Sequence, residues 1–182
     1  MDRAGKLAEG FAEAVAHWVD LQWSATIEHL RMVAPQTHGR LLDVGCGQKP
    51  YYDIIKPHVD EYVGIEYAPA FVETASSTKG KRGPDIVYDG DRMPLPDESF
   101  DTVMCIQVLE HTPKPQALLD DIARVLRPGG LLVISAPFSF RLHEEPNDYF
   151  RYTPHGLRKM LESAGLEVTS TLQQGGFWSV VG

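Results

Sequence analysis

Five short apolar runs, separated by helical or turn-rich stretches, constrain the fold of this chain more than any other feature. They are RLLDVG (40–45), EYVGIE (61–66), DIVYD (85–89), DTVMCIQ (101–107) and GLLVISA (130–136). Apolar runs of this length are typical of strands that are buried on both faces of a sheet. Because parallel strands need a crossover connection, the pattern predicts right-handed βαβ units. We therefore expect an α/β fold with a mostly parallel sheet and helices on both faces.

Three helical patterns accompany these runs. The first covers residues 5–33, and the second is PQALLDDIARVL, which begins at Pro115 and ends before RPGG. The third has Thr153 as its N-cap, a proline at its first position and Gly165 at its end. The LEVTSTLQQ segment that follows, residues 166–174, predicts a sixth strand.

Length and composition are those of one folded domain, and the chain of 182 residues suffices for a single substantial core. We expect one domain over residues 1–182, with an N-terminal helical cap (1–35), a central core (40–136) and a loop, helix and strand (137–182). The net charge of −8 disfavours a nucleic-acid partner.

The two cysteines, Cys46 and Cys105, lack metal-ligand spacing and favour a reducing compartment. We also find no signal peptide and no apolar run of about 20 residues that could span a membrane. The cytoplasm is the expected location.

The stretch RLLDVGCGQKP places Gly45 and Gly47 directly after the first predicted strand, as in sites for nucleotide-like cofactors. A dinucleotide fingerprint would have a third glycine at position 50, where this chain has Pro50. Pro50 has no N–H for a pyrophosphate, and its ring hinders close helix packing. An NAD-binding oxidoreductase is therefore disfavoured and stays an alternative.

Three acids, Asp43, Glu66 and Asp89, end three successive predicted strands and should meet at one edge of the sheet. Glu66 has the spacing of a ribose-binding carboxylate, whose charge-assisted hydrogen bonds contribute about 1.5–3 kcal/mol each. Asp89 can accept a hydrogen bond from an exocyclic amine. The set suits a ligand with an amine, a diol and a positive centre but no phosphate, and S-adenosylmethionine fits that description.

Residues 41–136 resemble the small class I S-adenosylmethionine-dependent methyltransferases of the type-11-like family. LLDVGCG, VGIE, YDGDRMPLPDESFDTVMC, VLEH and RVLRPGGLLVIS are similar to its successive motifs in order and spacing. The resemblance implies a Rossmann-like sheet of seven strands and S-adenosylmethionine as cofactor. Because the chain stops at Gly182, we expect the last strand to be lacking. Either the chain is truncated or another chain supplies the missing edge, and an uncovered edge favours a homodimer.

The resemblance also implies a set of cofactor-binding residues. They are Asp43, Gly45 and Gly47 along the methionine moiety, Glu66 at the ribose diol, Asp89 and Gly90 at the adenine, and Gln107 at the methionine end. Lys49 departs from the family, because many members have a third glycine there; it could pair with the methionine carboxylate.

His111 and His143 are the candidate general bases, since an imidazole near neutral pKa can take a proton from a hydroxyl. The alternative is that His111 only orients the turn into the next helix. A cation held by Gln107, Glu110 and His111 is a weaker interpretation because position 107 is an amide, so no metal is expected.

The long connection PFSFRLHEEPNDYFRYT, residues 137–153, is the expected substrate element. Tyr149, Arg151 and Tyr152 offer hydrogen-bond donors and stacking faces; the alternative is a salt-bridged surface loop. Its HEEPNDYFRYT segment is similar to methyltransferases of bacterial sugar and surface-glycan modification, which favours a small-molecule or glycan acceptor methylated at oxygen.

Other functions remain open. CIQV after the fourth strand is unlike the Asn/Asp-Pro-Pro-aromatic stretch of nucleobase amino-methyltransferases. A non-catalytic module that holds S-adenosylmethionine or S-adenosylhomocysteine would keep the three acids without using a base. Trp18 and Trp23 on the first helix predict a cap over the cofactor crevice; the alternatives are packing on the sheet and a surface for a partner.

Overall fold

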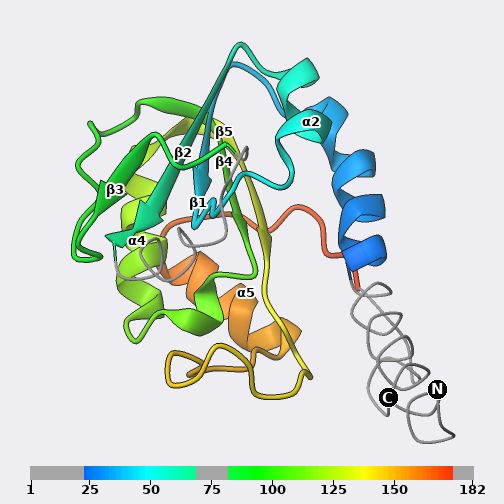
Figure 1. The fold of residues 1–182 in the computed structure, drawn as a ribbon, viewed down its shortest axis with the longest axis vertical. Helices are drawn as coiled ribbons and strands as arrows, with labels where there is room; N and C mark the ends of the chain where they lie inside the picture. The colour runs from blue at the N-terminus through cyan, green and yellow to red at the C-terminus, as the bar shows by residue number, and fades with distance from the viewer. Residues whose placement is uncertain (1–22, 69–81, 174–182) are drawn as a thin grey trace, which may run out of the picture.

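The computed structural model describes residues 23–68 and 82–173, which form a parallel sheet covered by helices (Figure 1). The strands are β1 (Arg40–Val44), β2 (Glu61–Tyr67), β3 (Ile86–Tyr88), β4 (Phe100–Ile106) and β5 (Leu126–Ser135). Their order is β3-β2-β1-β4-β5, and all four pairings are parallel. The predicted α/β fold is confirmed, and the order reverses between β1 and β4, where sheets of this type bind ligands at the carboxyl ends of the strands.

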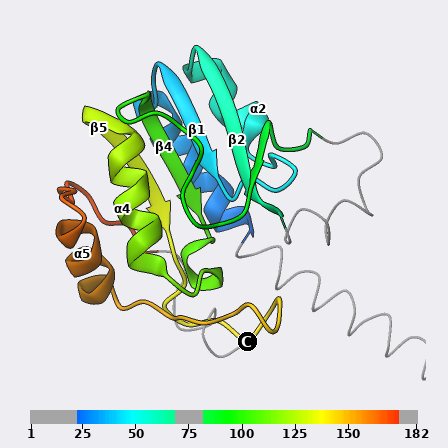
Figure 2. The ribbon, with the colours of Figure 1, turned by 90° about the vertical axis from the view of Figure 1, so that its left-hand side faces the viewer.

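Helices cover both faces of this sheet (Figure 2). Residues 23–33 form a helix that continues into η1 (Ala34–Gln36), and α2 (Tyr52–Ile55) continues into η2 (Lys56–His58). After β4 come η3 (Leu109–His111), α4 (Pro115–Val125) and α5 (Pro154–Ser163). No helix in these described parts of the chain is long and apolar enough to span a membrane.

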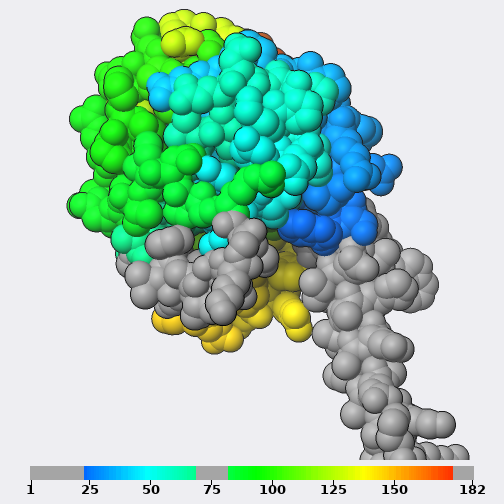
Figure 3. Space-filling model, turned by 45° about the horizontal axis from the view of Figure 1, so that its top comes forward, coloured from blue at the N-terminus to red at the C-terminus, as the bar shows by residue number. Residues whose placement is uncertain are grey.

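Two apolar clusters hold the layers together, one on each face of the sheet. The larger joins Leu42 and Val103 of the sheet to Ile122 of α4 and Leu161 of α5. The smaller one joins Leu30, Ala34, Leu41, Tyr51, Ile55, Val59, Tyr62, Met104 and Ile106. Figure 3 shows the blue residues of the first helix directly against the cyan ones that follow β1. The first described helix is thus anchored on one sheet face.

The predicted sixth strand is wrong for the described residues 166–173, which have no regular secondary structure. Leu166 and Val168 are partly buried against the larger cluster, as their alternation suggested. A strand also needs backbone hydrogen bonds from a neighbour, and no described strand pairs with this segment. Of the predicted helix over 5–33, the part before residue 23, including Trp18, lies outside the described residues.

The end of the 137–153 loop is fixed by the predicted cap of α5. The Thr153 hydroxyl accepts a hydrogen bond from Gly156 N–H at 3.0 Å, and Pro154 is the first helical residue. The side chain therefore satisfies a donor that the helix itself leaves unpaired.

We expect Thr153→Ala to lower the free energy of unfolding by about 1 kcal/mol, because it removes this cap. Urea denaturation measures the change, with Thr153→Ser as the matched control that keeps the hydroxyl. Equal stability of the alanine and serine variants would contradict the capping role.

Candidate cofactor and acceptor site

The turn after β1 owes its shape to two glycines. Gly45 and Gly47 have φ angles of 68° and 48°, which side chains rarely adopt. A Cβ on Gly45 would lie 2.4 Å from Cγ2 of Val108, so the turn packs tightly against the segment after β4. A Cβ on Gly47 would meet no atom of the described residues within 4 Å. Gly47 therefore leaves its backbone open to the approach of a ligand.

Glu66 closes the other side of this turn. Its carboxylate accepts hydrogen bonds from Gly47 N–H at 2.7 Å and Tyr67 N–H at 2.8 Å, one on each oxygen. The residue is 8% exposed, and this burial raises its pKa, while the two N–H donors act in the opposite direction. Because each carboxylate oxygen has two lone pairs, Glu66 can still accept two further hydrogen bonds, as a diol requires.

Asp43, in β1 just before the turn, accepts a hydrogen bond from a residue that the sequence analysis did not identify as part of the site. The Tyr62 hydroxyl donates to its carboxylate at 2.5 Å. Burial, together with a smaller contribution from the charge of Glu66, raises the pKa of Asp43 to about 7, while the hydrogen bond from Tyr62 acts in the opposite direction. The role of Tyr62 could be predicted only with knowledge of the register between β1 and β2, because this register brings the two residues together.

Lys49 has a partner within the protein. Its Nζ lies 2.6 Å from Oδ2 of Asp85, and its side chain is only 6% exposed. The same Asp85 oxygen accepts Gly64 N–H at 2.7 Å. Lys49, at the position where similar methyltransferases often have a glycine, thus connects the turn after β1 to the segment just before β3.

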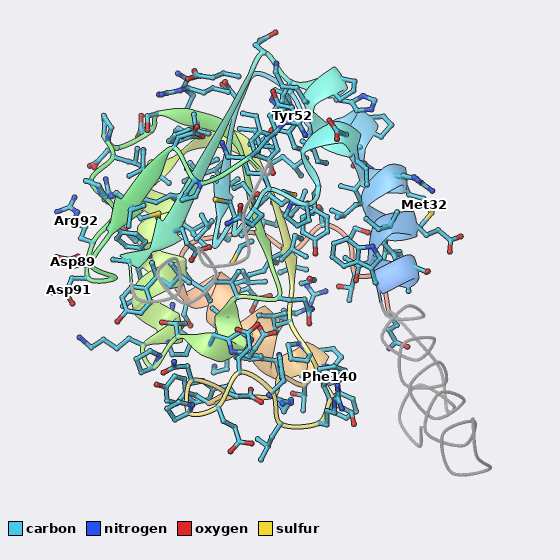
Figure 4. All side chains as sticks on the ribbon, in the orientation of Figure 1. Met32, Tyr52, Asp89, Asp91, Arg92 and Phe140 are labelled. Atoms are coloured by element: carbon cyan, nitrogen blue, oxygen red, sulfur yellow. The ribbon has the colours of Figure 1, made fainter. Side chains whose placement is uncertain are left out.

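Asp89 and Gln107 lie at the ends of two further strands. Asp89 is exposed after β3 and accepts the N–H of Asp91, so it forms an Asx turn with Gly90 beside it (Figure 4). Gln107 follows β4 with a φ of 55°, and its amide donates to the Ser135 hydroxyl at 3.1 Å. Their contacts with a cofactor stay predictions, as do those of Asp43 and Glu66.

The two candidate bases, His111 and His143, are neighbours despite their distance in sequence. Their ring centroids lie 4.7 Å apart at 80°. Nδ1 of His111 donates to the Asn147 carbonyl at 2.8 Å, and Nδ1 of His143 lies 3.2 Å from the Arg141 carbonyl. Because a carbonyl can only accept, the neutral form of each ring carries its lone pair on Nε2.

The 137–153 loop is braced by Arg151. The guanidinium bonds both carboxylate oxygens of Asp148, at 2.6 and 2.7 Å, and holds the pKa of that acid well below its usual range. Tyr152 is buried, and its hydroxyl donates to the Leu109 carbonyl at 2.9 Å. Tyr149, by contrast, is 45% exposed. Arg151 and Tyr152 thus bond to groups within the protein. Contact of Tyr149, Arg151 and Tyr152 with a methyl acceptor stays a prediction.

This arrangement defines a Rossmann-like domain with a candidate ligand site at the carboxyl ends of its strands. Residues 42–134 match the family described as a methyltransferase domain. The chain belongs to this methyltransferase family, which uses S-adenosylmethionine as methyl donor, and the predicted resemblance is confirmed.

Individual relatives of the chain are also named as methyltransferases. The chain is 30% identical over 140 residues to the "Probable S-adenosylmethionine-dependent methyltransferase/" of Mycolicibacterium smegmatis, covering 72% of this chain and 53% of that protein. It is 33% identical over 139 residues to the "Ubiquinone biosynthesis O-methyltransferase" of Paracidovorax citrulli, covering 69% and 58%. The chain thus spans somewhat more than half the length of these relatives. A SAM-dependent methyltransferase structure from Archaeoglobus fulgidus shares the fold, with a TM-score of 0.58, 23% identity and coverage of 77% and 67%.

The raised pKa of Asp43 predicts how stability depends on pH. Between the unfolded pKa of 3.8 and the folded pKa of about 7, the folded protein keeps a proton that the unfolded chain loses. The contribution of Asp43 to stability therefore falls as pH rises, with a slope of up to about 1.4 kcal/mol per pH unit. Asp43→Asn carries no charge, so its stability relative to the parent protein should increase from pH 4 to pH 7. Urea denaturation of both proteins measures this, and parallel profiles would contradict it.

Proposed function

We propose that this chain transfers a methyl group from S-adenosylmethionine to an oxygen of a small-molecule or glycan acceptor. The observation that carries the proposal is the position of Glu66, whose buried carboxylate lies against the open glycine turn with two lone pairs to spare. The O-methyltransferase name of the Paracidovorax citrulli relative supports oxygen as the acceptor atom.

The residues around the turn fit the cofactor. Gly47 gives open backbone, Glu66 offers acceptors for the ribose diol, and Asp43 is a buried acid near the turn. When bound, S-adenosylmethionine supplies a methyl group on a positively charged sulfur.

Glu66→Gln removes the charge of the carboxylate while keeping the size of the side chain. We therefore expect about 10- to 100-fold weaker binding of S-adenosylhomocysteine, measured by calorimetry. Glu61→Gln, an exposed acid on the same strand, is the control that should leave binding unchanged.

The two histidines are proposed to receive the proton of the acceptor hydroxyl. Their Nδ1 atoms donate to protein oxygens, so Nε2 is the basic nitrogen that such a transfer needs. The loop is bonded to η3 at two places, because the Asn147 carbonyl accepts from His111 Nδ1 at 2.8 Å and Tyr149 N–H donates to the Glu110 carbonyl at 2.9 Å. These contacts support a loop that lies at the carboxyl end of β4, with Tyr149, Arg151 and Tyr152 as its proposed acceptor residues.

The test is transfer of labelled methyl from S-adenosylmethionine to a panel of sugars and small phenols. We expect His111→Asn or His143→Asn to lower kcat about 100-fold or more, with S-adenosylhomocysteine affinity unchanged. His155→Asn, an exposed histidine on α5, is the matched control. Cofactor binding without transfer to any acceptor would instead favour a non-catalytic binding module. Unchanged kcat in both variants would show that neither imidazole is a base.

The first helix is proposed to cap the cofactor. Trp23 stacks on Tyr51 with centroids 5.5 Å apart, and Tyr51 directly follows the glycine turn in the chain. The start of the described helix is thus close to the glycine turn. We expect Trp23→Ala to weaken S-adenosylhomocysteine binding several-fold and Met32→Ala, an exposed control on the same helix, to leave it unchanged (Figure 4). Equal affinities would contradict the cap.

We also propose a homodimer and a cytoplasmic location. β5 is an edge strand of the described sheet, and an edge can pair with another chain. Cys46 and Cys105 are free and buried, in keeping with a reducing compartment. Light scattering over a wide concentration range tests the dimer, and a monomer throughout would contradict it.

A further inference from the structure

Three potential metal ligands meet where the 137–153 loop crosses η3. Glu110, His111 and His143 each offer one ligand atom, and these atoms lie within 4.8 Å of one another. It is the one group of this kind found among residues 23–68 and 82–173. Gln107 does not join it, because its amide is bonded to Ser135.

Glu110 is the most informative member of this cluster. Its side chain is fully buried, and neither carboxylate oxygen has a hydrogen-bond partner among the described residues. A buried carboxylate without a partner is costly, so such groups normally bind a donor, an opposite charge or a metal ion. The nearest cationic candidate is His111, whose Nε2 lies 3.8 Å from Oε1, beyond hydrogen-bond distance.

The two imidazoles are oriented as metal ligands usually are. Nδ1 of His111 is bonded to the Asn147 carbonyl, and Nδ1 of His143 lies near the Arg141 carbonyl and Asp148 Oδ2. Metal-binding histidines commonly donate their other ring N–H to a carbonyl or carboxylate, which fixes the tautomer and the direction of the lone pair. Nε2 of His111 lies 3.8 Å from the unpartnered carboxylate, and a ring nitrogen of His143 lies within 4.8 Å of the other two ligand atoms.

We propose that Glu110, His111 and His143 form a binding site for a divalent transition-metal cation, with Zn²⁺ as the cation that the donor set suits best. Two imidazoles and one carboxylate are a known zinc ligand set that leaves a coordination position open. Bonds of about 2.1 Å would draw the three atoms to about 3.4 Å from one another, a movement within reach of side-chain rotation. The exposed Glu144, 3.9 Å from His111 Nε2, could add a carboxylate oxygen.

A cation at this position would join η3 to the loop and offer an open coordination position to an acceptor oxygen. It would also occupy the Nε2 lone pairs that base catalysis needs, so the histidines would act as ligands in the metal-bound protein and as bases only without it. The site itself rests on protein groups alone and does not depend on methyl transfer.

The test is calorimetric titration of the chelator-treated protein with Zn²⁺, with Co²⁺ absorption as a second probe of the ligand set. We expect one equivalent of Zn²⁺ to bind, the melting temperature to rise, and Co²⁺ to give a spectrum of nitrogen and oxygen ligation. Glu110→Gln should weaken Zn²⁺ binding at least 10-fold while both imidazoles remain. Glu145→Gln, an exposed acid on the same loop, is the matched control.

His143→Gln should weaken Zn²⁺ binding as well, since it removes the ligand that the loop supplies. Circular dichroism and S-adenosylhomocysteine binding, measured on the same samples, show that each variant is folded. No Zn²⁺ binding by the folded parent protein, or equal affinity in the Glu110 and Glu145 variants, would overturn the proposal. Because S-adenosylhomocysteine binding is read separately, failure of the metal site is distinguishable from failure of the methyltransferase function.

Discussion

The hydrogen bond from Gly47 N–H to Glu66 joins the turn after β1 to the end of β2, and the arrangement of the cofactor side depends on it. The bond requires a glycine turn with positive φ angles, a parallel register that brings β2 alongside β1, and a glutamate at the carboxyl end of β2. The first requirement concerns local backbone conformation, the second the pairing of strands in the sheet, and the third the identity of one residue. Together they place a buried carboxylate beside open backbone, which is how a phosphate-free nucleoside can be held.

Buried acids are the common physical theme of the site. Burial raises the pKa of Asp43, Glu66 and Glu110, and the three differ in what compensates that burial. Asp43 has the Tyr62 hydroxyl and Glu66 has two backbone N–H groups, whereas Glu110 has no hydrogen-bond partner in the described chain. Ionisable groups held this way cluster at functional sites, because a ligand can supply the missing interaction. The proposed cofactor would use the first two acids and the proposed cation the third.

Local sequence patterns predicted the frame of the molecule well. The apolar runs identified five strands, and Thr153 with its following proline identified the start of α5. Glu66 could be predicted as well, because a strand of known length carries it to the sheet edge. The predicted sixth strand was wrong, since alternation of Leu166 and Val168 shows burial but not the presence of a pairing neighbour.

Long-range packing was beyond the sequence. The Asp43–Tyr62 and Lys49–Asp85 pairs depend on the register of adjacent strands. The approach of His143 to His111 depends on how Asp148 and Arg151 brace the loop.

Binding of S-adenosylmethionine by the glycine turn and Glu66 is tested by calorimetric titration of the protein with S-adenosylhomocysteine and, in parallel, with NAD. We expect binding of S-adenosylhomocysteine in the micromolar range and no binding of NAD. Binding of NAD without S-adenosylhomocysteine would contradict it.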